Sequence, residues 1–143
     1  MSEWRSQVDM AELDRRSRGC FPGMVGVEMV RLAELEVSMR LELRSEHLAP
    51  HGFLHGAVVV ALADTACGYG TLAHLPQGAS SFTTIELKTN YLGTAREGAI
   101  VCDARPLHMG RSTQVWDAEV RNEASGQRIA LFRCTQMILW PKS

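Results

Sequence analysis

The hydrophobic pattern of the chain centres on one stretch, residues 55–75, which reads HGAVVVALADTACGYGTLAHL. Its residues are apolar or small on every side, and its opening His55-Gly56-Ala57 is typical of a helix start. A helix that is apolar all round is normally buried in a core. At about 1.5 Å per residue it would be roughly 28 Å long. One carboxylate, Asp64, stands near its middle, although Asp is almost never fully buried unless it is paired or used.

Strands are predicted on both sides of this helix. Residues 35–44 alternate apolar and polar side chains with a period of two, and a shorter alternation begins at Val25. These two strands should form a hairpin that turns near Ala33-Glu34. Four further strands are expected at 82–92, 99–107, 113–121 and 128–140. Strands in immediate succession favour hairpins, so we expect an α+β fold in which a curled, mostly antiparallel sheet of about six strands wraps one long central helix.

A single domain is expected, because 143 residues is an ordinary domain size. Residues 4–18 carry an imperfect apolar stripe that predicts a short helix, and residues 19–23 should end it. The chain is therefore divided into an N-terminal helical segment, 1–22, and one domain, 23–143.

Composition disfavours several classes of partner. The net charge is −1 and no long basic run occurs, so nucleic-acid binding is not expected. The first 20 residues lack the apolar core of a signal peptide. A membrane span over 57–75 is disfavoured by Asp64 and His74. We expect a cytoplasmic protein whose cysteines, which form no C-x-x-C pair, are mostly small core residues rather than disulfides.

The carboxylate in the helix allows two interpretations. Its neighbours on the same side of a helix cannot pair with it, and they are Val60, Ala61, Cys67 and Gly68. Asp64 could be satisfied by a nearby backbone or hydroxyl group, as carboxylates in structural networks are. Alternatively it is a catalytic carboxylate in a cleft, acting as general base or nucleophile.

The helix start offers a second chemical group. A helix N-terminus presents unpaired N–H groups and the positive end of the dipole, and Gly56 lets a ligand approach them closely. Such a site suits an anion or a developing oxyanion. Gly56 and Asp64 would lie about 12 Å apart along the helix, too far to serve one small reacting group in one subunit. If both are catalytic, each of two subunits supplies one, which predicts a dimer.

Polar residues also mark the first strand after the helix. Four of them are expected to share one face: Thr84, Glu86, Lys88 and Asn90. Glu86 and Lys88 fit a solvated face, whereas Thr84 lies nearest the loop and could hold a water or a substrate. His51 and His55 have no evident third ligand, so no metal site is expected.

Three segments together resemble a known family: GFLHGA at 52–57, LADTA at 62–66 and TIELKTNYL at 84–92. They are similar to the hotdog-fold acyl-CoA thioesterases, most closely the phenylacetate-degradation type related to 4-hydroxybenzoyl-CoA thioesterases. The resemblance covers roughly residues 20 to 140. It implies a helix held in a curled sheet, dimers that pair into tetramers, and active sites that straddle the dimer interface.

The resemblance also implies residue roles. Asp64 would be the catalytic carboxylate, the Gly56 N–H would polarise the thioester carbonyl, His55 would shape the loop, and Thr84 would assist the water or the carboxylate. The turn at Arg111-Ser112 is expected to touch the CoA nucleotide, since cationic and hydroxyl groups suit phosphates.

This sequence departs from the family pattern at the substrate site. Ala57 replaces the second glycine of the family's His-Gly-Gly, and Ala49 stands where an Asn or Gln is often found. Gly93-Thr94 replaces the usual Arg-Pro. Small residues beside Asp64, Gly68 among them, leave room for an acyl group.

The sequence therefore predicts hydrolysis of an aryl- or medium-chain acyl-CoA. Asp64 would activate water or attack directly to give an anhydride. No metal or cofactor is needed, since coenzyme A is part of the substrate. The alternative is a non-catalytic hotdog protein that binds acyl-CoA, and a hotdog hydratase is a weaker third hypothesis.

Overall fold

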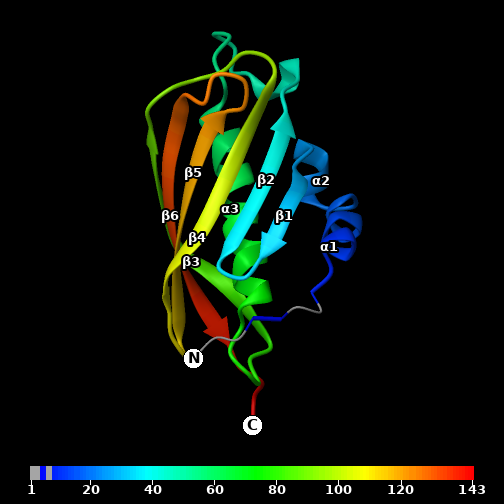
Figure 1. Cartoon of the computed structure of the whole chain (residues 1–143), viewed down its shortest axis with the longest axis vertical. Coiled ribbons are helices and arrows are strands. Elements are labelled where there is room, and N and C mark those ends of the chain that lie inside the picture. Colours follow the sequence, from blue (N-terminus) through cyan, green and yellow to red (C-terminus); the bar gives the residue numbers. More distant parts are fainter. Residues whose placement is uncertain (1–3, 6–7) are drawn as a thin grey trace.

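The structure is a computed structural model that describes residues 4–5 and 8–143. In chain order the elements are α1 (Met10–Ser17), α2 (Phe21–Val25), β1 (Glu28–Ala33), β2 (Glu36–Glu42), the 3-10 helix η1 (Ser45–His47), α3 (Gly56–Ala73), β3 (Ser81–Tyr91), β4 (Ala99–Met109), β5 (Thr113–Asn122) and β6 (Arg128–Leu139). The six strands form one sheet in the order β1-β2-β4-β5-β6-β3, and every neighbouring pair is antiparallel (Figure 1). The expected α+β arrangement, a long helix wrapped by an antiparallel sheet, is confirmed.

The predicted strands are confirmed closely. Those after the helix begin and end within two residues of the expected bounds. The β1–β2 hairpin turns where it was expected, because Ala33 pairs with Glu36 and Leu35 adopts a positive φ of 61° between them. Val25, expected to begin the first strand, instead ends α2.

The N-terminal helix is shorter than predicted. α1 begins after Asp9, whose side chain accepts a hydrogen bond of 3.0 Å from the Ala11 N–H, and residues 6–7 of the predicted helix lie outside the described part. The sequence prediction also missed α2, where only a break was expected. Pro22 suits the first turn of a helix, and Gly26 ends α2 with a φ of 97°.

Residues before α1 pack against the far end of α3. The Arg5 N–H donates to the Ala73 carbonyl at 2.9 Å, and the Trp4 ring lies 5.0 Å from the His74 ring. His74 is buried, accepts the Leu35 N–H at Nε2 and donates from Nδ1 to the Gly70 carbonyl. Burial lowers the pKa of His74, which favours this neutral form.

Small residues allow α3 to approach the sheet. Figure 1 shows the helix running behind β2, β4 and β5 for most of its length. Gly70 faces Trp116, a fully buried residue of β5, and a Cβ at Gly70 would lie 2.5 Å from the ring carbons. The absence of that one carbon therefore sets how closely helix and sheet pack.

α3 has the length and composition of a membrane span, with a mean hydropathy of 1.4 over Gly56–Ala73. In the fold it is the core helix, because 56% of that window is buried inside the chain. Its apolar surface is thus accounted for by the sheet that wraps it.

We predict that Gly70→Ala destabilises the protein by about 1–3 kcal/mol, because the added methyl group overpacks the core against Trp116. Denaturant unfolding followed by Trp fluorescence measures the loss. Gly19→Ala is the matched control, since a Cβ there meets nothing within 4 Å. Equal stability of the two variants would contradict this account of the helix–sheet contact.

Candidate active site

Asp64 lies in the middle of α3 and is half-buried. Its Oδ1 atom is buried and has no hydrogen-bond partner among the described residues. Burial raises the pKa of the Asp64 carboxyl above its usual range. An unpaired buried carboxylate oxygen is costly, and such groups are concentrated at functional sites.

The stripe of α3 that carries Asp64 faces β3. Gly68 lies one turn further along the same side, and a Cβ at Gly68 would lie 3.2 Å from the ring of Phe82. At the start of the helix, the Tyr91 hydroxyl donates to the Gly56 carbonyl at 3.2 Å. α3 therefore runs antiparallel to β3, with Asp64 opposite the middle of the strand.

Thr84 lies on the face of β3 that looks toward the helix. It pairs in register with Gln136 of β6, and its hydroxyl donates to Gln136 Oε1 at 2.6 Å. Gln136 is fully buried, and its Nε2 has no partner among the described residues. The sequence prediction missed Gln136, although its alternation with Cys134 and Ile138 placed a polar side chain on an apolar face.

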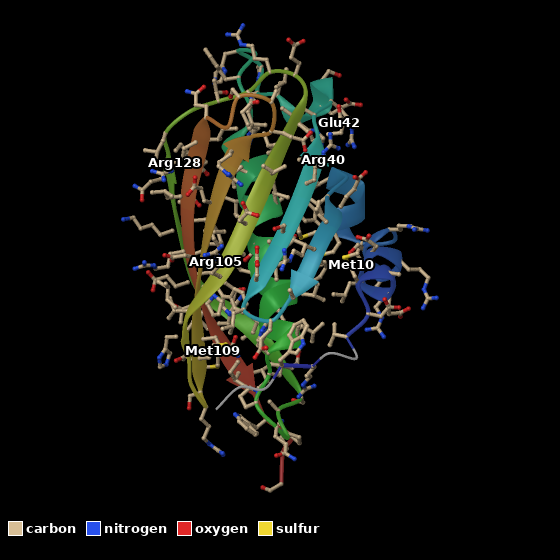
Figure 2. All side chains as sticks on the ribbon, viewed as in Figure 1. Met10, Arg40, Glu42, Arg105, Met109 and Arg128 are labelled. Carbon is tan, nitrogen blue, oxygen red and sulfur yellow. The ribbon has the colours of Figure 1, made fainter. Side chains whose placement is uncertain are left out.

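The expectation that four polar residues of β3 share one face is wrong. A β-bulge between Thr84 and Glu86 adds one residue, so the later side chains change sides. Lys88 and Asn90 line an open cavity of about 550 Å³ on the outer face of the sheet, together with Arg105. Figure 2 labels Arg105 on β4. Asp64 is not among the residues that line it.

The helix start forms a second group of predicted site residues. His55 caps the helix, since its Nδ1 accepts the Ala57 N–H at 3.0 Å. The Gly56 N–H makes no hydrogen bond within the described chain. Ala57 is exposed, and Ala49 lies in the preceding loop, where its N–H donates to the Phe53 carbonyl at 2.7 Å. This end of α3 can therefore offer one free backbone donor to a ligand.

Arg111 and Ser112 lie at the opposite end of the molecule from the helix start. Their turn follows Met109, which lies at the lower end of β4 in Figure 2. Arg128, the first residue of β6, lies toward the upper end of the molecule in the same view. The Arg111 guanidinium stacks 4.4 Å from the centre of the Trp140 ring. In one chain, the structure thus separates Arg111 and Ser112 from Gly56.

Metal and disulfide chemistry can be checked for the described residues. They contain no group of three or more His, Cys, Asp or Glu side chains placed to hold a metal ion. Cys67, Cys102 and Cys134 are buried and unpaired by disulfides, as expected, while Cys20 is exposed.

The sequence profile of the thioesterase superfamily matches residues 51–129, more than half of the chain. The chain therefore belongs to the thioesterase superfamily and is a thioester hydrolase with the hotdog fold. The family resemblance inferred from Gly56, Asp64 and the strand that follows is confirmed.

Individual relatives agree with this family. A 1,4-dihydroxy-2-naphthoyl-CoA hydrolase of Listeria monocytogenes is 30% identical over 111 residues, which are 78% of this chain and 89% of that protein. A thioesterase from Pseudomonas aeruginosa, solved as a variant with one glutamine replaced by alanine, gives a TM-score of 0.89 at 24% identity and covers 95% of this chain and 97% of that chain. The Escherichia coli PaaI protein from the phenylacetic acid degradation operon gives a TM-score of 0.76 at 24% identity and covers 91% of this chain and 88% of that chain. The two solved structures bear on the fold alone.

We predict that Asp64→Asn unfolds at a higher temperature than the native chain at pH 8, by a few degrees. The raised pKa means that folding disfavours the ionised carboxylate, a penalty present above the folded pKa and lost as pH falls below the unfolded pKa. The advantage of Asn should therefore shrink in acid. Thermal unfolding between pH 8 and pH 4 measures it, with the exposed Glu86→Gln as control. A lower melting temperature for Asp64→Asn at pH 8 would show that the carboxylate is satisfied in the fold.

Proposed function

We propose that the protein hydrolyses aryl- or medium-chain acyl-CoA thioesters to the free acid and CoA. Asp64 supplies the catalytic carboxylate, and the Gly56 N–H of a second subunit stabilises the oxyanion. The observation that carries the proposal is the buried, unpaired Oδ1 of Asp64 on the helix stripe that faces β3. No other group on that stripe can take up a proton at neutral pH.

The chemistry requires a base or nucleophile and an oxyanion donor. A carboxylate with a raised pKa is a stronger base than an ordinary one, which suits removal of a proton from water. As the C–O bond forms, negative charge develops on the thioester oxygen, and a free N–H at a helix N-terminus stabilises it. Breaking the C–S bond then releases CoA as a thiolate, which takes up the proton that Asp64 removed.

Two subunits are needed because of the geometry of α3. Asp64 and Gly56 lie about 12 Å apart along the helix axis. β3 is an edge strand of 11 residues that pairs with β6 on one side only, and it has exposed apolar side chains at Ile85, Leu87 and Tyr91. Antiparallel pairing of β3 with a second copy would put the Tyr91 end of one strand beside the Phe82 end of the other. Because Gly56 lies at Tyr91 and Gly68 at Phe82, this pairing brings the helix start of one chain toward Asp64 of the other.

The proposal also specifies the acyl group, the residues that contact the substrate, and the assembly of the enzyme. An aryl substrate is supported by the named substrate of the Listeria relative, and the Phe82 ring that packs at Gly68 would border the acyl group. Ala49 and Ala57 would border the thioester, while Arg111 and Ser112 would contact CoA phosphates. The enzyme would act in the cytoplasm as a dimer of dimers, without a metal or further cofactor.

We expect Asp64→Ala to lower thiol release from its best acyl-CoA substrate by about a hundredfold or more, the scale of a positioned acid–base group. A panel of aryl- and alkyl-CoA thioesters, followed with a thiol reagent, identifies that substrate. Glu86→Gln removes a carboxylate on the opposite face of β3 and should leave the rate unchanged. Saturable binding of CoA ligands without any turnover would support the binding-protein alternative instead.

Mixing two inactive variants tests the shared site. Gly56→Pro removes the N–H at the first position of the helix, which proline tolerates, and should lower the rate by about 10²–10³-fold. Gly56→Ala is its control, because it retains the N–H while adding the same Cβ against Tyr91. In two-fold dimers formed from Gly56→Pro and Asp64→Ala chains, one site is intact, so co-expression should restore about one quarter of the native activity. No recovery in purified heterodimers would place both groups in one subunit.

A further inference from the structure

We infer that Gln136 is a positioning residue for hydrolysis, which fixes the Thr84 hydroxyl and completes, with Asp64, the site of the attacking water. The inference rests on the proposed function. It adds one residue to the proposed site, and it favours activation of water by Asp64 over direct attack by the carboxylate.

The setting of Gln136 is unusual for an amide. It lies on the core face of β6 between Cys134 and Ile138 and is fully buried. Its Oε1 accepts the Thr84 hydroxyl at 2.6 Å, while its Nε2 has no partner among the described residues. A buried donor without an acceptor is destabilising, which points to a group that occupies this place during function.

Gln114 shows how the fold treats an amide with a purely structural role. It pairs with Gln136 across β5 and β6 and is also fully buried. Its Nε2 donates to the His74 carbonyl and its Oε1 accepts the Trp116 indole N–H, each at 2.8 Å. Both ends of Gln114 are therefore satisfied, whereas one end of Gln136 is free.

Asp64 is directed toward the same place. Cys67 follows Asp64 by three residues and is a buried neighbour of Cys134, which precedes Gln136 on the core face of β6. Gly68, on the Asp64 stripe, faces Phe82, and Thr84 is the next core-facing residue of β3. These two neighbours place the turn of α3 that carries Asp64 over the part of the sheet that holds Thr84 and Gln136.

The hydrogen-bonding capacities of these groups match one water. Thr84 has a single hydroxyl proton, which it gives to Gln136, so its oxygen can only accept further bonds. A water can then donate one hydrogen to Asp64 Oδ1 and the other to Thr84 Oγ1, and accept from Gln136 Nε2. Three polar partners are typical for a buried water. One lone pair remains, and it points the water oxygen at an acyl carbon.

This arrangement favours activation of water over attack by the carboxylate. The water oxygen forms the new C–O bond, and its proton passes to Asp64. The C–S bond then breaks, and the CoA thiolate takes the proton from Asp64, which returns to its starting state. If Asp64 attacked the acyl carbon directly, no water would be the nucleophile. The Thr84–Gln136 pair would then make no hydrogen bond to the attacking group in the first step.

A double-mutant cycle tests the inference on the full-length dimer. Gln136→Leu and Thr84→Val should each lower kcat by about ten- to a hundredfold with KM changed less than about threefold. The two losses should fall short of multiplying in the double variant, because Gln136 fixes the Thr84 hydroxyl and both residues hold the same water. Losses that multiply in the double variant, or an unchanged kcat for Gln136→Leu, would overturn the inference.

The matched control is Gln114→Leu, which removes a buried amide of the same size from the neighbouring strand. It should lower the melting temperature more than Gln136→Leu does, because it leaves the His74 carbonyl and the Trp116 N–H unpaired. Its kcat per folded enzyme should stay at the native value. A fall in kcat for Gln114→Leu equal to that for Gln136→Leu would mean that both act only on packing.

An isotope experiment tests the chemical step. In one turnover with enzyme in excess and water labelled with heavy oxygen, the released acid should carry the label. Label found in Asp64, with unlabelled acid, would establish carboxylate attack and overturn the assignment of the water. Loss of activity in Asp64→Ala with normal rates in Gln136→Leu would refute this inference alone, whereas native activity in Asp64→Ala would refute the proposed function.

Discussion

The whole fold depends on the burial of one helix that is apolar on almost every side. α3 carries ten buried residues, from Val59 to Ala73, and none of its faces could be left in water without cost. A flat sheet would cover only one of them. The six antiparallel strands therefore curl around the helix, and Gly70 lets the Trp116 ring pack against its backbone. The hotdog architecture is the consequence of this single close contact between a helix of small residues and a twisted sheet.

The same small residues that allow this packing create the site. The space beside Gly70 is filled by Trp116, from the centre of the sheet. Gly68 instead faces Phe82 on the edge strand β3, where one side of the sheet is open. Asp64 lies one turn before Gly68, and its Oδ1 is withdrawn from water without a partner among the described residues. Burial thus raises the carboxyl pKa at a local cost to folding, and in the proposed mechanism that raised basicity serves to remove a proton from water.

Much of this could be predicted from the sequence because hydrophobic periodicity reports directly on burial. The helix, the hairpin at Ala33-Glu34 and the late strands followed from it, and so did the anomaly of Asp64. The bulge after Thr84 could not be predicted, since the alternation over residues 85–91 is already regular and nothing in it marks the added residue. The start of α1 is set by the Asp9 cap, which the apolar stripe did not reveal, and the docking of Trp4 on His74 is a long-range contact that no local pattern encodes.

Gln136 shows a different limit of sequence reasoning. A polar residue in an apolar strand is normally satisfied inside the protein, as Gln114 is by Trp116 and His74. The two glutamines occupy paired positions on β5 and β6, so composition and alternation cannot tell them apart. Only the count of hydrogen bonds separates them.

In the proposed dimer, the open edge of β3 would link stability to activity. An exposed edge strand with apolar side chains is a liability for a protein that remains a monomer. Pairing with a second copy would bury Ile85 and Tyr91 and satisfy the free backbone groups of β3 in the same step. It would also close the side from which Asp64, Thr84 and Gln136 are reached, leaving the helix start of the other chain as the donor nearest to them. Assembly and completion of the site are on this view one event, because both are consequences of leaving the strand opposite Asp64 at the edge of the sheet.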